Sequence, residues 1–148
     1  MTRARKKDHR HRAREAALQI LYQWDIARGE VERAAETFFT RQWPDADPPP
    51  DALRAFASAL ACDTAARIET IDPLIAGTAE RWRPERMAVL DRLILRMAVC
   101  ELMRDPETPP AVVINEALEL ARTFSTEESV KFINGMLDAI RKKLDALR

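Results

Sequence analysis

Residues 84–104 read PERMAVLDRLILRMAVCELMR, and apolar side chains occur on nearly every side of the helix that this segment would form. Most helices of soluble proteins carry an apolar stripe on one side only, because the other side faces water. A helix that is apolar around most of its circumference is usually enclosed by other helices. The segment therefore predicts a central core helix against which the rest of the chain packs.

The segments on both sides of this helix repeat their apolar residues at intervals of three and four, the spacing of amphipathic helices. Prolines and the three glycines separate them, and no run alternates in the manner of a strand. We therefore predict an all-α fold, a compact bundle of about seven helices. The predicted helices near the central one span about 11–28, ended by Gly29, and 31–43, 51–71, 111–124 and 126–147, with a rigid loop at 44–50.

Two helix boundaries are predicted from local signals. Asp72 and Pro73 indicate either a kink or the start of a short helix that ends near Gly77. Ser125 and Glu128 have the spacing of a capping box, in which each side chain satisfies the free backbone N–H of the other residue.

Positive charge is concentrated at the N-terminus. The first fourteen residues hold seven of the 24 Lys and Arg residues and one acid, so the remaining chain carries 17 basic and 23 acidic side chains. We predict a flexible basic arm at residues 1–11 and a single helical domain at 12–148. A basic arm on an acidic body favours two partners of opposite charge, because electrostatic fields act locally in salt solution.

The sequence lacks the residues that several kinds of catalytic and metal-binding site require. No histidine follows residue 14, and no glycine-rich phosphate loop or zinc-binding motif occurs, so we expect no enzyme, no cofactor and no metal site. Cys62 and Cys100 are more simply two small buried side chains than a disulfide. No segment is apolar and long enough for a membrane span or a secretory signal, which predicts a cytoplasmic protein without a membrane partner.

Polybasic segments bind nucleic acids mainly by releasing counterions from phosphates. Arg10, Arg12 and Arg14 lead directly into a helix that bears Tyr22 and Trp24, and single-stranded RNA is typically held by such cations and stacking aromatics. Gly135 interrupts the last helix, where either tight helix packing or close approach of RNA would explain it. Both explanations stay open from the sequence.

Three stretches resemble the NusB family of bacterial transcription antitermination factors: RAREAALQILYQWD (12–25), AVLDRLILRMAVCEL (88–102) and AVVINEALELARTFSTEESVKFINGML (111–137). The resemblance covers nearly the whole chain. It implies a fold of two packed helical subdomains. It also implies binding of the single-stranded boxA element of ribosomal RNA leaders together with ribosomal protein NusE, within an RNA polymerase antitermination complex.

The resemblance also implies site residues. By matching position, the RNA-binding residues would be Arg12, Arg14, Tyr22, Lys131, Phe132 and Asn134, and Arg10 joins them on charge. The NusE-binding candidates are Glu85, Asp91, Glu101 and Glu128, each of which is equally well explained as a solvated carboxylate. The alternative function is a helical protein-interaction module or ribosome assembly factor with incidental RNA affinity. Self-association into a homodimer is left open.

Overall fold

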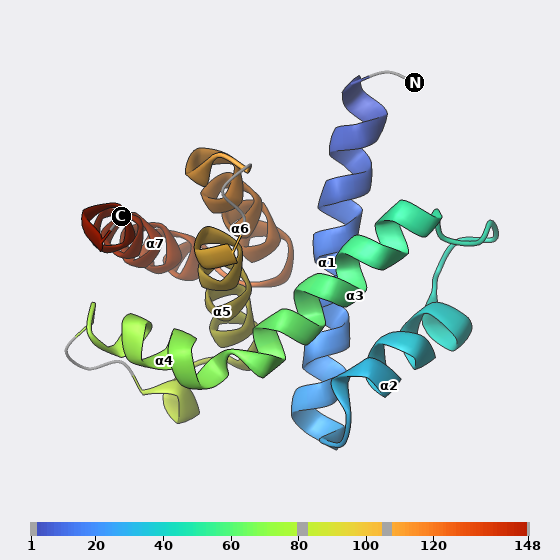
Figure 1. Ribbon diagram of the computed structural model, residues 1–148, viewed down its shortest axis with the longest axis horizontal. Helices are drawn as coiled ribbons and strands as arrows, with labels where there is room; N and C mark the ends of the chain where they lie inside the picture. Colours follow the sequence, from blue (N-terminus) through green and yellow to red (C-terminus); the bar gives the residue numbers. More distant parts are fainter. Residues whose placement is uncertain (1–2, 80–82, 105–107, 148) are drawn as a thin grey trace. The chain divides into compact units, whose positions relative to one another are not determined.

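The computed structural model describes residues 3–79, 83–104 and 108–147, and Figure 1 shows helices joined by short connections. Over these ranges the chain forms seven α-helices and no strand, which confirms the predicted all-α bundle. The helices are α1 (Arg3–Ala27), α2 (Val31–Thr37), α3 (Asp51–Ala66), α4 (Ile68–Ala76), α5 (Val89–Arg104), α6 (Pro110–Phe124) and α7 (Glu127–Leu147). None of these helices is long and apolar enough to cross a membrane.

The chain divides into two compact units, residues 1–65 and 66–148. Two helical units agree with the two subdomains that the family resemblance implies. The extent of a single domain over residues 12–148 stays a prediction.

The first unit contains α1, α2 and most of α3. Small and aliphatic side chains of α1, such as Ala13, Ala17 and Ile20, are fully buried. The helix ends where Arg28 and Gly29 adopt left-handed backbone angles (φ of 63° and 80°), so the predicted stop at Gly29 is confirmed. The predicted start at about His11 was wrong, because α1 begins at Arg3. Residues 3–10 contain strong helix formers and no proline or glycine, so no local signal prevents the helix from extending back to Arg3.

A π-helical turn, Phe38–Gln42, continues α2 where one long helix was expected. The turn brings three aromatic rings together: Phe38 packs on Phe39 with ring centroids 5.1 Å apart, and Trp43 lies 6.2 and 5.8 Å from them. The proline-rich loop follows, and α3 begins at Asp51 as predicted.

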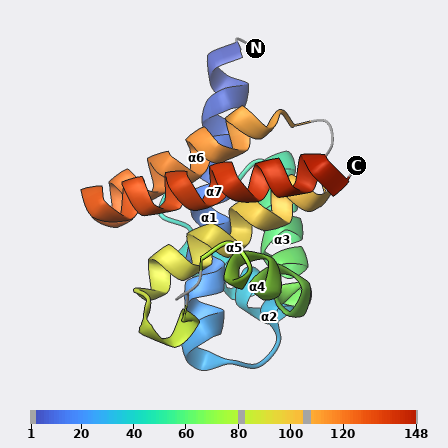
Figure 2. The ribbon, with the colours of Figure 1, turned by 90° about the vertical axis from the view of Figure 1, so that its left-hand side faces the viewer.

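The second unit is built around α5, which contacts α4, α6 and α7. Figures 1 and 2 both show α5, α6 and α7 side by side. Every side chain from Leu93 to Leu102 is buried, which confirms the central core helix. The helix begins at Val89 rather than Pro84, because residues Pro84–Arg86 form a short 3-10 turn. Part of the expected loop before α6, residues 105–107, lies outside the described residues.

Both local boundary predictions need correction. The helical path is interrupted at Arg67, between α3 and α4, and Pro73 lies inside α4. The predicted end near Gly77 is confirmed, since α4 ends at Ala76. The Asp72 carboxylate does not cap a helix but accepts two hydrogen bonds from Arg96, at 2.9 and 2.7 Å.

The cap of α7 also differs from the prediction. The hydroxyl of Thr126, not of Ser125, accepts a hydrogen bond from the Ser129 N–H at 3.0 Å. Ser125 instead donates to Asp91 of α5, at 2.5 Å. At both boundaries, the polar side chain that the local pattern assigned to a cap instead forms hydrogen bonds with a residue distant in the sequence.

Candidate nucleic-acid interface

The arginines of α1 lie against aromatic rings of the first unit. The Arg10 and Arg14 guanidinium groups, one helical turn apart, lie 4.3 and 5.2 Å from the ring centroid of Phe56 in α3. The Arg12 guanidinium lies 4.9 Å from the Trp43 ring and pairs with the Asp45 carboxylate. A cation over an aromatic ring is attracted by about 0.5–1 kcal/mol at exposed sites, which favours these positions of the guanidinium groups. The structure thus presents these charges from ordered positions.

The three arginines differ in their access to solvent. Arg10 is exposed and Arg12 is half-buried, but Arg14 is only 4% exposed. A phosphate cannot reach a side chain with so little accessible surface without moving its neighbours. The predicted RNA contact of Arg14 would require its neighbours to move and stays a prediction, while its guanidinium contributes to the packing of α1 against Phe56.

Tyr22 lies further along α1 and is 40% exposed, so one part of its ring is open to a stacking base. Trp24, the other aromatic side chain of α1 named from the sequence, is half-buried, and its indole N–H donates to the Gly29 carbonyl at 2.9 Å.

Lys131, Phe132 and Asn134 are all exposed near the start of α7, in the second unit. Phe132 is 41% exposed beside the fully buried Ile133, so part of its ring is open to solvent. The structure therefore brings these three predicted residues together on one short segment. The predicted residues of α1 belong to the other unit.

Gly135 lies one turn after Lys131 and is exposed. A Cβ atom added at this glycine would meet no atom within 4 Å. Of the two explanations left open by the sequence, tight packing of another helix of this chain is thus wrong as far as the described residues extend. Close approach of an external ligand stays a prediction.

We expect Gly135→Ala to stabilise the fold and weaken RNA binding together. Alanine is favoured over glycine in a helix by about 1 kcal/mol, and the site has room for the methyl group. Thermal unfolding should show a higher Tm, while RNA titration should show a lower affinity. Loss of binding in a more stable protein cannot come from unfolding. A raised Tm with unchanged affinity would place the RNA away from Gly135.

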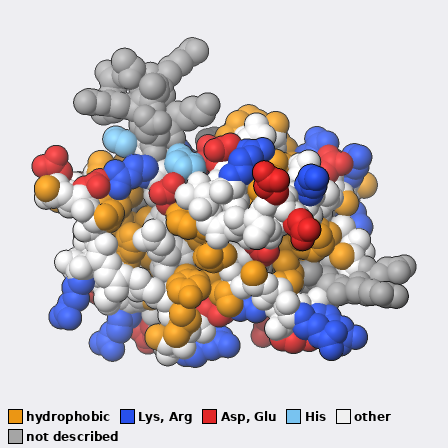
Figure 3. All heavy atoms as spheres, turned by 180° about the vertical axis from the view of Figure 1, so that it is seen from behind, with side chains coloured by type: hydrophobic (Ala, Val, Ile, Leu, Met, Phe, Trp, Pro, Cys, Tyr) orange, Lys and Arg blue, Asp and Glu red, His pale blue; other side chains and the backbone are white. Residues whose placement is uncertain are grey.

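The four carboxylates predicted to bind a partner fall into two classes. Glu85 and Glu128 are exposed, in the 3-10 turn and the first turn of α7. Asp91 and Glu101 are 8% and 2% exposed on α5. A helix enclosed on most sides leaves few positions at the surface, so a partner would reach Asp91 and Glu101 only if their neighbours moved, and their contact stays a prediction. Figure 3 shows Asp and Glu side chains interspersed with Lys and Arg on one face of the molecule.

Within the fold, Asp91 holds the start of α7 in position. Its two carboxylate oxygens accept hydrogen bonds from the hydroxyls of Ser125 and Ser129, at 2.5 and 2.6 Å. These bonds connect α5 to the junction of α6 and α7. Asp91 thereby fixes the start of α7, the segment that carries Lys131 and Phe132.

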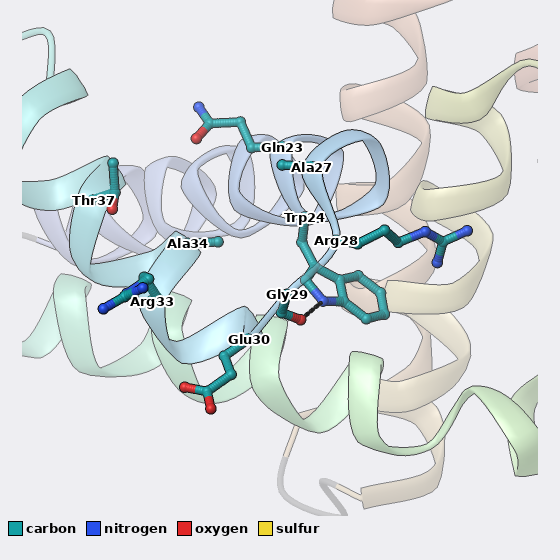
Figure 4. A pocket seen from close by; sticks show the side chains of 9 residues that line it. All are labelled: Gln23, Trp24, Ala27, Arg28, Gly29, Glu30, Arg33, Ala34 and Thr37. Atoms are coloured by element: carbon teal, nitrogen blue, oxygen red, sulfur yellow. Dashed lines mark hydrogen bonds between the residues drawn. The ribbon is translucent and has the colours of Figure 1, made fainter.

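A pocket of about 500 Å³ lies at the corner between α1 and α2, and sequence reasoning missed it. Figure 4 shows the Trp24 indole across it, with its hydrogen bond to Gly29. The lining residues are Gln23, Trp24, Ala27, Arg28, Gly29, Glu30, Arg33, Ala34 and Thr37. The left-handed corner creates this space, and periodicity carries no signal for it.

Cys62 and Cys100 are free thiols, and Cys100 is buried. Burial raises the pKa of the Cys62 thiol, and the Glu32 and Asp63 carboxylates raise it further. A thiol with a raised pKa is protonated at neutral pH and is a poor nucleophile. No cluster of possible metal ligands occurs within residues 3–79, 83–104 and 108–147.

Comparison with known proteins gives extended matches. A model of the NusB family matches residues 11–142. The transcription antitermination protein NusB of Koribacter versatilis is 47% identical over 139 residues, which cover 94% of this chain and 92% of the relative. The protein of the same name from Solibacter usitatus is 46% identical over 135 residues, which cover 91% and 90%.

Solved structures agree with this result. NusB of T. maritima matches with a TM-score of 0.80 and 32% identity, over 90% of this chain and 91% of that chain. A structure of the antitermination factors NusB and NusE in complex with dsRNA matches with a TM-score of 0.77 and 26% identity, over 92% and 98%. The likeness therefore extends over nearly the whole chain rather than one motif.

Proposed function

Because this chain belongs to the NusB family, we propose that it is a transcription antitermination factor that binds leader RNA of the boxA type together with ribosomal protein NusE. The family match over residues 11–142 carries this proposal. It also confirms the family that the sequence motifs indicated. The chain is a non-enzymatic factor, since its work is to bind RNA and protein within an RNA polymerase complex. We place that work in the cytoplasm, where bacterial transcripts are made.

We propose that RNA contacts Arg10, Arg12 and Tyr22 on α1, and Lys131, Phe132 and Asn134 on α7. Five of the six are exposed, and Arg12 is half-buried with 40% of its side chain accessible, which supports this set. Cations that track the backbone and aromatics that stack on bases are the usual means of holding a single strand. The Arg14 guanidinium packs against Phe56, the ring that also contacts Arg10.

We propose that the NusE contact involves Glu85 and Glu128, the two exposed members of the predicted acidic set. A basic ribosomal protein would favour such carboxylates. Asp91 and Glu101 are buried, so we do not include them in the proposed contact.

The decisive experiment compares boxA RNA with a scrambled strand of equal length and with a duplex, at about 0.15 M salt. We expect the boxA strand to bind more tightly than both, and NusE to strengthen that binding. Linkage requires RNA to strengthen NusE binding by the same factor, and such couplings are typically about 5- to 150-fold. Titration calorimetry of each ligand, alone and with the other, measures the full cycle.

Equal affinity for all three RNAs, with and without NusE, would contradict the proposal. The protein would then act as a helical interaction module or assembly factor with incidental RNA affinity. Independent binding of RNA and NusE would remove the cooperative mechanism but leave the RNA function intact.

A further inference from the structure

The loop at residues 44–50, PDADPPP, leaves the aromatic cluster of the first unit in a fixed direction. Trp43 has an extended backbone (φ −60°, ψ 122°), as expected for a residue before proline. Its indole N–H donates to the Asp47 carbonyl at 3.0 Å, and its ring packs against Phe38 and Phe39. The position of the loop is therefore set by the folded unit. Asp45 loses little additional conformational freedom when it pairs with a cation.

The Arg12 guanidinium is held from two directions within this unit. The Trp43 ring lies at 4.9 Å, and the Asp45 carboxylate forms an ion pair with Nη1. The side chains of Arg12 and Asp45 are 40% and 43% exposed, so an incoming anion can reach the pair from solvent. The planar guanidinium offers the same donors to a carboxylate and to a phosphate.

We propose that Asp45 competes with RNA phosphate for Arg12, and that Trp43 keeps the guanidinium in place while one anion replaces the other. This inference rests on the proposed RNA-binding function and adds two residues to that site. An exposed ion pair is weak and readily broken, so displacement of Asp45 is a small cost for a strand that makes several contacts. An isolated anion, which makes only this contact, gains little by displacing it.

The competition lowers RNA affinity without removing a contact. Asp45→Asn frees Arg12 and should raise the affinity for boxA RNA by about two- to fivefold, the range of exposed ion pairs. The number of neutralised phosphates is the same in both proteins. The dependence of log K on log salt should therefore keep its slope, whereas loss of the Arg12 contact should flatten it by about 0.7.

The loop supplies a matched control. Asp47 carries the same charge two residues away, but it contributes its backbone carbonyl to Trp43 rather than its carboxylate to Arg12. Asp47→Asn therefore measures the general effect of removing one negative charge, and we expect a smaller gain. In an Arg12→Gln background, Asp45→Asn should gain no more than Asp47→Asn, since the competition needs Arg12. Circular dichroism of each variant checks that the fold is kept.

The outcomes separate the two proposals. If the wild-type protein binds boxA RNA no better than scrambled RNA, the proposed function is contradicted, and the proposed competition is contradicted as well. Specific binding by the wild type, with equal gains for Asp45→Asn and Asp47→Asn, leaves the function in place and overturns the competition. Weaker binding by Asp45→Asn also overturns it, because Asp45 would then position Arg12 for RNA.

Discussion

Replacing Arg3, Arg5, Lys6 and Lys7 with glutamine is expected to weaken binding of boxA RNA on the order of 100-fold at about 0.15 M salt. This loss follows when each of the four cations neutralises one phosphate. Each lost contact lowers the slope of log K against log salt by about 0.7, so the four together should lower it by up to about 2.8. Titrations at several salt concentrations measure both quantities.

Glutamine is a suitable substitute because the four residues lie in a helix. The four cations lie in α1, which begins at Arg3, and glutamine has nearly the same helix propensity as arginine and lysine. The charge is therefore removed while the backbone preference is kept. Fold stability should change little.

A control removes two positive charges elsewhere. Arg122 pairs with Glu119 on α6, and Lys142 pairs with Asp138 on α7. Changing both to glutamine should have only a small effect on RNA affinity per charge removed. Equal losses per charge at the two places would indicate that a diffuse electrostatic field, rather than the N-terminal segment, attracts the RNA.

Asp72→Ala is expected to destabilise the protein by about 3 kcal/mol, because it leaves the Arg96 guanidinium without its carboxylate partner. The Arg96 side chain is 10% exposed, and its two hydrogen bonds to Asp72 join α5 to α4. A loss of this size should lower Tm by roughly 6–12 °C in a chain of this length. Chemical and thermal denaturation, followed by circular dichroism, measure it.

Two variants test the cause. Asp72→Leu combined with Arg96→Met should recover most of the loss, since an apolar pair needs no charge compensation. Asp138→Ala removes an exposed carboxylate whose pKa is lowered mainly by its hydrogen bond from Lys142, and it should change Tm much less. If Asp72→Ala costs no more than Asp138→Ala, the Asp72–Arg96 pair contributes little to stability.

The helical class, the central helix and most of the helix positions follow from the amino-acid sequence alone. Spacings of three and four report which side of a helix is apolar, and this information is contained in neighbouring residues. Gly29 and the proline-rich loop marked ends that the structure keeps, because their backbone restrictions are local. Motifs distributed along the chain indicated the family, and with it the residues to consider for RNA binding.

The roles of the individual polar residues depend on contacts that form only in the folded chain. Asp91 binds Ser125 and Ser129, Asp72 binds Arg96, and Asp45 binds Arg12, all pairs separated by at least 24 residues. Spacing within a helix cannot report such partners. It also could not show that Arg14 and Glu101 are buried, or that the space beside Gly135 is open. These outcomes depend on which segments meet after folding, because distant contacts outweigh the small free energies of local caps and turns.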